Sequence, residues 1–143
     1  MIVLVHHADA VGPDVDPQRP LSAAGRAHAD RLARDLAAKE VRPAAIWHSG
    51  KLRARQTAEA FLRTCNPMAE FSAIRGLQPT DPPEWIRDRL VGESRDVMLV
   101  GHMPGLPRIL ETLTHEQHRE FPQHSAVALE AKGGEWRVLW IKE

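Results

Sequence analysis

The chain has a single cysteine, Cys65, among its 143 residues. One cysteine cannot form an intrachain disulfide and supplies too few thiolates for a cysteine-based zinc site, which suits a reducing compartment such as the cytoplasm. Excess charge of either sign is also lacking, because 19 Lys and Arg balance 19 Asp and Glu. We therefore expect no nucleic acid and no membrane surface as a partner.

Long apolar runs are absent as well. No segment approaches the roughly 20 apolar residues that a membrane-spanning helix requires. The apolar start of the sequence has no basic leader before it, so we expect a strand there and no signal peptide. Hydrophobic residues make up 43% and charged residues 27% of the chain, which is typical of a soluble globular protein. At this length we expect one domain over residues 1–143.

Short β-branched runs alternate with segments of helical periodicity along the whole chain. The pattern predicts strands over residues 2–5, 44–48, 69–74, 96–100 and 125–131, and a last strand after the Gly133-Gly134 turn, in which Trp136, Val138 and Trp140 alternate with other residues. It predicts four helices. The first covers residues 22–39, the second runs from the turn at residues 49–50 to about residue 63, the third follows Asp81 and the fourth begins at Pro104. This order predicts an α/β fold with three α/β/α layers, a largely parallel central sheet and a C-terminal antiparallel hairpin.

Two helix starts are predicted in more detail. Ser22 is a suitable N-cap for the first helix. The third helix follows Asp81, two prolines and Glu84, a sequence typical of a capped start, and we expect it to bury Trp85 together with Ile86 and Leu90.

Two histidines, His7 and His102, directly follow predicted strands. Ligands of parallel sheets bind at the carboxyl ends of the strands, so both rings are expected to face one crevice together with residues 49–57. A neutral imidazole can attack phosphorus directly, and the planar fork of Arg53 matches a phosphate. His102 can donate a hydrogen bond to a phosphate oxygen, and peptide N–H groups at the helix opened by Pro104 add a positive field.

These segments resemble the motifs of the histidine phosphatase superfamily, in particular its short, SixA-like phosphohistidine phosphatase branch. Residues 4–8, LVHHA, correspond to a strand ending in Arg-His-Gly. Residues 49–57, SGKLRARQT, correspond to Ser-Pro-x-x-Arg-Ala-x-Gln-Thr, and residues 100–104, VGHMP, correspond to a strand followed by Gly-His-x-Pro. Weaker matches are RPLS at residues 19–22 with Gly25, and Ser125-Ala126.

The resemblance implies a phosphoglycerate mutase-like fold and a phosphatase that needs no metal or other cofactor. It implies that His7 is the nucleophile, that His102 is a second catalytic residue and that Arg53 binds phosphate. Arg19 either reaches the phosphate or braces its loop. The substrate is a phosphorylated protein or a small phosphorylated molecule. A phosphohistidine protein is favoured because the short connections leave little material for a lid over a small molecule.

The sequence departs from the family at the site itself. His6 stands where the family has a phosphate-binding arginine, and it can replace that charge only when it is protonated. Ala8 stands in place of glycine, so we expect its backbone to lie further from the ligand.

The remaining polar residues are assigned with less support from the motifs. Asp81 is a possible general acid, although a cap is the commoner role before Pro-Pro. Ser49 and His124 are candidates for lining the pocket, and His48 is a weaker one. We expect Arg55 to be solvated and the other histidines to lie at the surface: His28, His115 and His118.

Three alternatives stay open at this point. A zinc hydrolase could use His6, His7, His102 and His124, although adjacent residues of a strand point to opposite faces. A phospho-ligand-binding module could have lost turnover through the altered first motif. A broad small-molecule phosphomonoesterase would keep the mechanism but act on other substrates.

Overall fold

The computed structural model describes residues 1–117 and 119–143, with ten elements in the described part of the chain. The strands are β1 (Ile2–His6), β2 (Ala45–His48), β3 (Glu70–Ala73), β4 (Val97–Gly101), β5 (Ala126–Lys132) and β6 (Glu135–Lys142). The helices are α1 (Ala23–Ala38), α2 (Leu52–Cys65), α3 (Glu84–Leu90) and α4 (Gly105–Thr114). Every predicted element is present within a few residues of its expected position.

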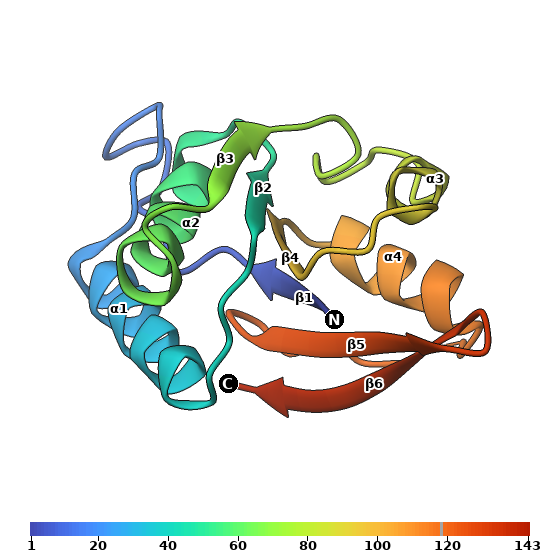
Figure 1. Ribbon diagram of the computed structural model, residues 1–143. Helices are drawn as coiled ribbons and strands as arrows, with labels where there is room; N and C mark the ends of the chain where they lie inside the picture. The colour runs from blue at the N-terminus through green and yellow to red at the C-terminus, as the bar shows by residue number, and fades with distance from the viewer. Residues whose placement is uncertain (118) are drawn as a thin grey trace.

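The strands form one sheet in the order β3-β2-β4-β1-β5-β6. Neighbours from β3 to β1 are parallel, whereas β5 is antiparallel to both β1 and β6. Apolar residues of α1 and α2 pack on one face of the sheet, and those of α3 and α4 pack on the other. Figure 1 shows the two helix pairs on opposite sides of the sheet. The predicted three-layer α/β/α fold with a C-terminal hairpin is confirmed.

The start of α1 is as predicted, because the Ser22 hydroxyl accepts a hydrogen bond from the Gly25 N–H. The start of α3 is different. Its N-cap is Pro83, which has no side-chain cap, and the Asp81 carboxylate instead accepts the N–H groups of Gly76 and Gln78, both at 3.0 Å. Asp81 therefore braces the loop before the helix and does not cap it.

The prediction that Trp85 is buried is wrong. A helix of seven residues buries one narrow stripe, and Ile86 and Leu90, which lie four residues apart, fill it. Trp85 points away from that stripe and keeps 41% of its surface exposed.

The last strand also departs from simple alternation. Trp136 and Val138 pack against the α3/α4 side of the sheet, whereas Trp140 packs against the α1/α2 side. The cause is a register shift between Ala128 and Leu129, which pair with Trp140 and Val138 respectively and leave Leu139 as the extra residue. Such a bulge exchanges the faces of the residues that follow it.

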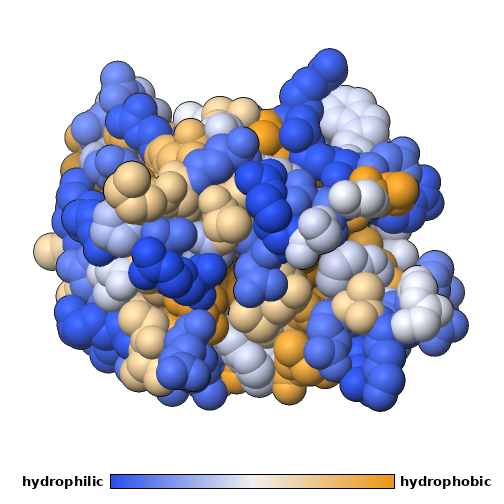
Figure 2. Space-filling model, viewed as in Figure 1, coloured by the Kyte–Doolittle hydropathy of each residue, from blue (hydrophilic) through white to orange (hydrophobic). Residues whose placement is uncertain are grey.

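Within the described part of the chain, no helix is long and apolar enough to cross a membrane. The face seen in Figure 2 is covered mostly by hydrophilic side chains, with small apolar areas between them.

Candidate active site

Four histidine rings meet at the carboxyl ends of β1 and β4. His6 is the last residue of β1 and pairs in register with Gly101, so His7 and His102 emerge side by side. The centroid of the His7 ring lies 4.5 Å from that of His6 and 5.0 Å from that of His102. The ring of His124, just before β5, stacks on His6 with centroids 4.9 Å apart. The structure thus brings the expected His7 and His102 together, and it places His6 and His124 beside them.

The hydrogen bond of His7 determines which ring nitrogen is free. Its Nδ1 lies 2.7 Å from the carbonyl oxygen of Ala8. A carbonyl only accepts, so Nδ1 carries the proton and Nε2 keeps its lone pair. Burial lowers the pKa of His7 to about 4, partly opposed by the bond to Ala8, while the nearby Arg53 lowers it further. His7 is therefore neutral at pH 7, the form that an attacking imidazole needs.

His6 does not carry the positive charge that the sequence led us to consider. Its Nδ1 accepts the backbone N–H of His124 at 2.8 Å, so that nitrogen is unprotonated. Burial lowers the pKa of His6 to about 3, and the neighbouring His7, His124 and Arg53 lower it further. A neutral His6 offers one N–H, at Nε2, and no charge in place of the family arginine.

His124 is held by three hydrogen bonds in a left-handed conformation with φ of 56°. Besides donating its N–H to His6, it donates from Nδ1 to the His7 carbonyl oxygen at 2.7 Å. Its own carbonyl lies 2.8 Å from Nε2 of His28, whose Nδ1 accepts from Arg31. His28, which we expected at the surface, lies on α1, is half-buried and bonds to the site through His124. Helical periodicity could not reveal this, because the contact joins residues 96 positions apart.

His102 is buried and bonded to Ser49, with Nε2 and the hydroxyl oxygen 2.7 Å apart. Its Nδ1 is buried and has no hydrogen-bond partner among the described residues. Burial lowers the pKa of His102 to about 3, and the charges of His7, Arg53 and Lys51 contribute. The Leu106 N–H at the start of α4 bonds to the His102 carbonyl at 2.9 Å, so this N–H is not available to a ligand.

Two arginines lie close enough to His7 to act on its charge. Arg53, in the first turn of α2, and Arg19 both lower the pKa of His7. The Nε of Arg53 is buried and finds no partner within the part of the chain that the structure describes. Arg19 bonds from Nε to the Val11 carbonyl at 3.0 Å, so it does brace its loop. Burial and the charge of Arg19 lower the pKa of Arg53.

The Gln-Thr end of the second motif joins the segments of the site. The Thr57 hydroxyl accepts the Ala8 N–H at 3.0 Å and donates to the Arg53 carbonyl at 2.8 Å. Gln56 accepts the Leu21 N–H at 2.8 Å through its side-chain oxygen. Ala8 is 2% exposed, its φ is not positive, and its methyl group packs in the core. The backbone conformation at residue 8 thus does not require a glycine.

A hollow of about 410 Å³ begins at Ser49. Its other walls come from the loop after β3 and from α3: Ala73, Ile74, Arg75, Gln78, Asp81 and Trp85. Asp81 thus lines the same hollow as Ser49, which bonds to His102. Its carboxylate already accepts two backbone N–H groups.

Other candidates lie elsewhere. His48 is buried, accepts the Gly50 N–H at 3.0 Å and packs on Phe71, a structural role. His115 is exposed at the end of α4, as expected, and His118 lies outside the described residues. No group of three or more His, Cys, Asp or Glu side chains in residues 1–117 and 119–143 has the arrangement of a metal site.

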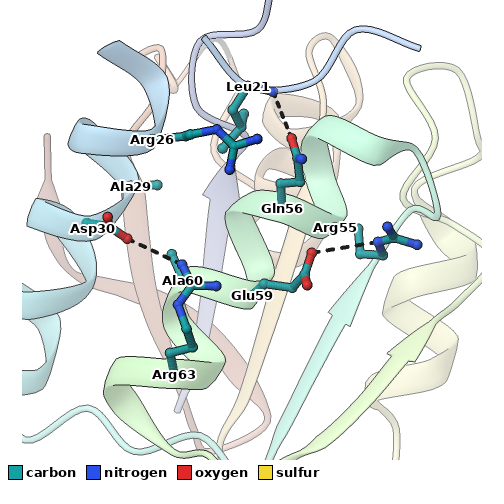
Figure 3. A pocket seen from close by; sticks show the side chains of 9 residues that line it. All are labelled: Leu21, Arg26, Ala29, Asp30, Arg55, Gln56, Glu59, Ala60 and Arg63. Atoms are coloured by element: carbon teal, nitrogen blue, oxygen red, sulfur yellow. Dashed lines mark hydrogen bonds and ion pairs between the residues drawn. The ribbon is translucent and has the colours of Figure 1, made fainter. Parts of the chain in front are cut away.

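A separate hollow of about 320 Å³ lies between α1 and α2, and no histidine is among its lining residues (Figure 3). Two of its arginines face carboxylates: Arg55 lies 3.7 Å from Glu59, and Arg63 lies 3.5 Å from Asp30. Arg26 lines the hollow as well, but no histidine does, so we assign no phosphoryl transfer to it. Arg55 is exposed, as predicted.

A model of the histidine phosphatase superfamily (branch 1) matches residues 6–86. A search of curated proteins found no match.

Among solved structures, the protein histidine phosphatase SixA in complex with tungstate is 21% identical, with a TM-score of 0.87 over 99% of this chain and 95% of that one. A protein from Agrobacterium tumefaciens proposed to be the phosphohistidine phosphatase SixA is 25% identical, with a TM-score of 0.82 over 99% and 96%. A phosphoserine phosphatase from Entamoeba histolytica, in complex with 3-phosphoglyceric acid, is 12% identical, with a TM-score of 0.78 over 99% and 96%.

Proposed function

The chain belongs to the histidine phosphatase superfamily, and from this premise we propose that it is a phosphatase whose His7 carries the phosphoryl group between substrate and water. One observation carries the proposal. Two buried polar atoms, Arg53 Nε and His102 Nδ1, have no partner among the described residues, and both belong to residues beside the neutral ring of His7. Buried polar groups are nearly always hydrogen-bonded, so unpaired ones at a site indicate a polar ligand.

The first step follows from the tautomer of His7. The Nε2 lone pair attacks phosphorus, the bond from phosphorus to the leaving atom breaks, and the leaving group takes that electron pair. The ring becomes cationic as the bond forms, and the Ala8 carbonyl that holds the Nδ1 proton stabilises this charge. Water then attacks the phosphohistidine and loses a proton, which releases inorganic phosphate and restores Nε2.

The phosphoryl oxygens need positive charge and hydrogen-bond donors while the bonds change. Arg53 supplies the charge and an N–H from Nε. The Lys51 N–H already donates to the Ser49 hydroxyl oxygen at 3.2 Å, so the hydroxyl proton can point at Nε2 of His102. His102 then carries its own proton on Nδ1, where it donates to phosphate. Arg19 adds longer-range charge from its braced loop.

The leaving group receives little help from the protein. Asp81 is the carboxylate candidate, but its Oδ2 already accepts two backbone N–H groups, which hold it in its own loop. A protonated imidazole leaves more easily than an alkoxide, so this site suits N–P cleavage better than ester hydrolysis. We therefore propose a phosphohistidine protein as the substrate, with small phosphate esters as slower alternatives, and the cytoplasm as the location.

The neutral His6 supports a second candidate function. A phosphate site without the family arginine lacks one strong donor, and such a loss typically lowers the rate by about 10²–10³. A module that binds a phosphorylated ligand without turnover would retain Arg53 and His102 and bind anions equally well.

Phosphate release separates these functions. The wild-type protein is assayed on a phosphohistidine protein and on a panel of small phosphate esters, with and without a chelator, beside His7→Ala and the matched surface variant Arg55→Ala. We expect release that is fastest from phosphohistidine, insensitive to chelation, abolished in His7→Ala and unchanged in Arg55→Ala. Anion binding without any release would assign the binding module, and loss of activity on chelation would assign a metal hydrolase.

A further inference from the structure

The hollow beside Ser49 continues into a second one. The first has a volume of about 410 Å³, and the second, of about 380 Å³, shares Arg75 and Trp85 with it and adds Asp88 and Arg89. We call the two together the Trp85 trough. It runs from Ser49, one hydrogen bond away from His102, to the outer side of α3.

The inner end of the trough is fixed in place. Gln78 donates from its side-chain nitrogen to the Ser49 carbonyl at 2.8 Å, and Asp81 accepts the Gln78 N–H. These bonds tie the wall of the trough to the residue that contacts His102. A molecule lying in the trough is therefore positioned relative to the phosphoryl site.

The chemistry of the trough is cationic and aromatic. The Arg75 guanidinium lies 5.0 Å from the centroid of the exposed Trp85 ring, and Arg89 lies over Trp47 at 5.4 Å. Neither arginine has a carboxylate within ion-pair distance among the described residues. The two carboxylates in the trough are already engaged, Asp81 by backbone N–H groups and Asp88 by Arg87 at 3.0 Å.

We propose that the Trp85 trough binds the polypeptide next to the phosphorylated residue and selects substrates with acidic side chains there. This inference rests on the proposed phosphatase function and names its substrate more closely. An acidic side chain pairs with Arg75 and Arg89, while a peptide plane or an apolar side chain lies against Trp85. An arginine stacked on an aromatic ring keeps N–H groups free at its edge for a carboxylate.

The test uses freshly prepared phosphohistidine peptides with either glutamate, alanine or lysine beside the phosphorylated residue, and phosphoramidate as a small reporter without flanks. The charge reversal Arg75→Glu is compared with Arg42→Glu, an exposed arginine at the opposite end of β2. For Arg75→Glu we expect kcat/KM to fall about five- to tenfold on the glutamate peptide and to rise on the lysine peptide, as for a reversed surface charge pair. Activity on the reporter should stay unchanged, and Arg42→Glu should resemble the wild-type protein throughout.

Equal effects of Arg75→Glu on all substrates, or no preference of the wild-type protein for glutamate, would overturn the trough assignment while leaving the phosphatase proposal intact. The same peptides are also titrated onto His7→Ala by fluorescence anisotropy, which needs no turnover. If neither the reporter nor any of the peptides is hydrolysed, the proposed function fails, and the anisotropy preference for glutamate still decides the trough. Its presence in His7→Ala and its loss on adding Arg75→Glu support the assignment, and its absence refutes it.

Discussion

Replacing His6 by asparagine tests whether this ring is neutral in the folded protein. The Nδ1 of His6 accepts the His124 N–H, and an asparagine side-chain oxygen can occupy about the same position and accept the same bond. Asparagine does not titrate in the relevant range. The variant therefore removes the proton equilibrium of His6 while preserving the contact that holds the ring.

The expected difference in stability depends on pH. His6 has a pKa of about 3 in the folded protein, whereas an unfolded chain has about 6.5. Between these values the unfolded state binds the proton and the folded state does not, so acid favours unfolding. The contribution of His6 to stability is fully present above pH 6.5 and is lost as the pH falls toward 3. At pH 5, about 1.5 units below the unfolded value, the loss is about 2 kcal/mol.

Urea unfolding followed by circular dichroism at pH 7, 6 and 5 measures this loss by linear extrapolation. The wild-type protein should lose about 2 kcal/mol more free energy of unfolding than His6→Asn between pH 7 and pH 5. His7 and His102 are present in both proteins, so their own acid sensitivity largely cancels in the comparison. Equal losses in the two proteins would mean that His6 takes up its proton in the folded state, which would contradict a pKa lowered to about 3.

Further substitutions at His6, Arg53 and His124 probe the site. His6→Arg restores the family's charge and should raise the rate of hydrolysis across pH 6 to 8. It leaves the His124 N–H without its acceptor, which should cost about 1–3 kcal/mol in stability. An unchanged rate in a folded, anion-binding variant would show that residue 6 does not limit activity. Arg53→Ala should weaken vanadate or phosphate binding in calorimetry by about 1.5–3 kcal/mol, and unchanged affinity would place the anion elsewhere. His124→Gly and His124→Ala both keep the N–H that bonds to His6 but lose the donor to the His7 carbonyl, so kcat should fall in both. The glycine variant should be about 1 kcal/mol more stable than the alanine variant, because alanine keeps the strain of the left-handed backbone. A kcat equal to that of the wild-type protein in both would exclude a positioning role for His124.

The fold was predictable because its signals are local. Buried parallel strands appear as continuous β-branched runs, and helices appear as apolar residues at helical spacing. The elements and their alternation can therefore be predicted from short windows of sequence. The rule that ligands lie at the carboxyl ends of strands then brought His7 and His102 together. The bulge that turns Trp140 to the other face of the sheet has no such signal, because it depends on how two strands pair.

The electrostatics of the site were not predictable, because they depend on burial and on contacts across the chain. The low pKa of His6 comes first from burial and then from the neighbouring His7, His124 and Arg53, and burial depends on how the whole site packs. His28 reaches the site through His124, to whose carbonyl it bonds. Asp81 matched a helix cap by its neighbours in sequence, yet the loop turns so that its carboxylate meets two backbone N–H groups first.

Rapid quench with labelled substrate tests directly whether His7 takes up the phosphoryl group. The wild-type protein is mixed with a ³²P-labelled phosphohistidine protein, quenched in alkali within the first turnover, digested and mapped by mass spectrometry. We expect one labelled residue, His7, through a bond that is stable in base and labile in acid, and no label in His7→Ala. Turnover with the label on another residue, or full turnover in His7→Ala, would contradict it.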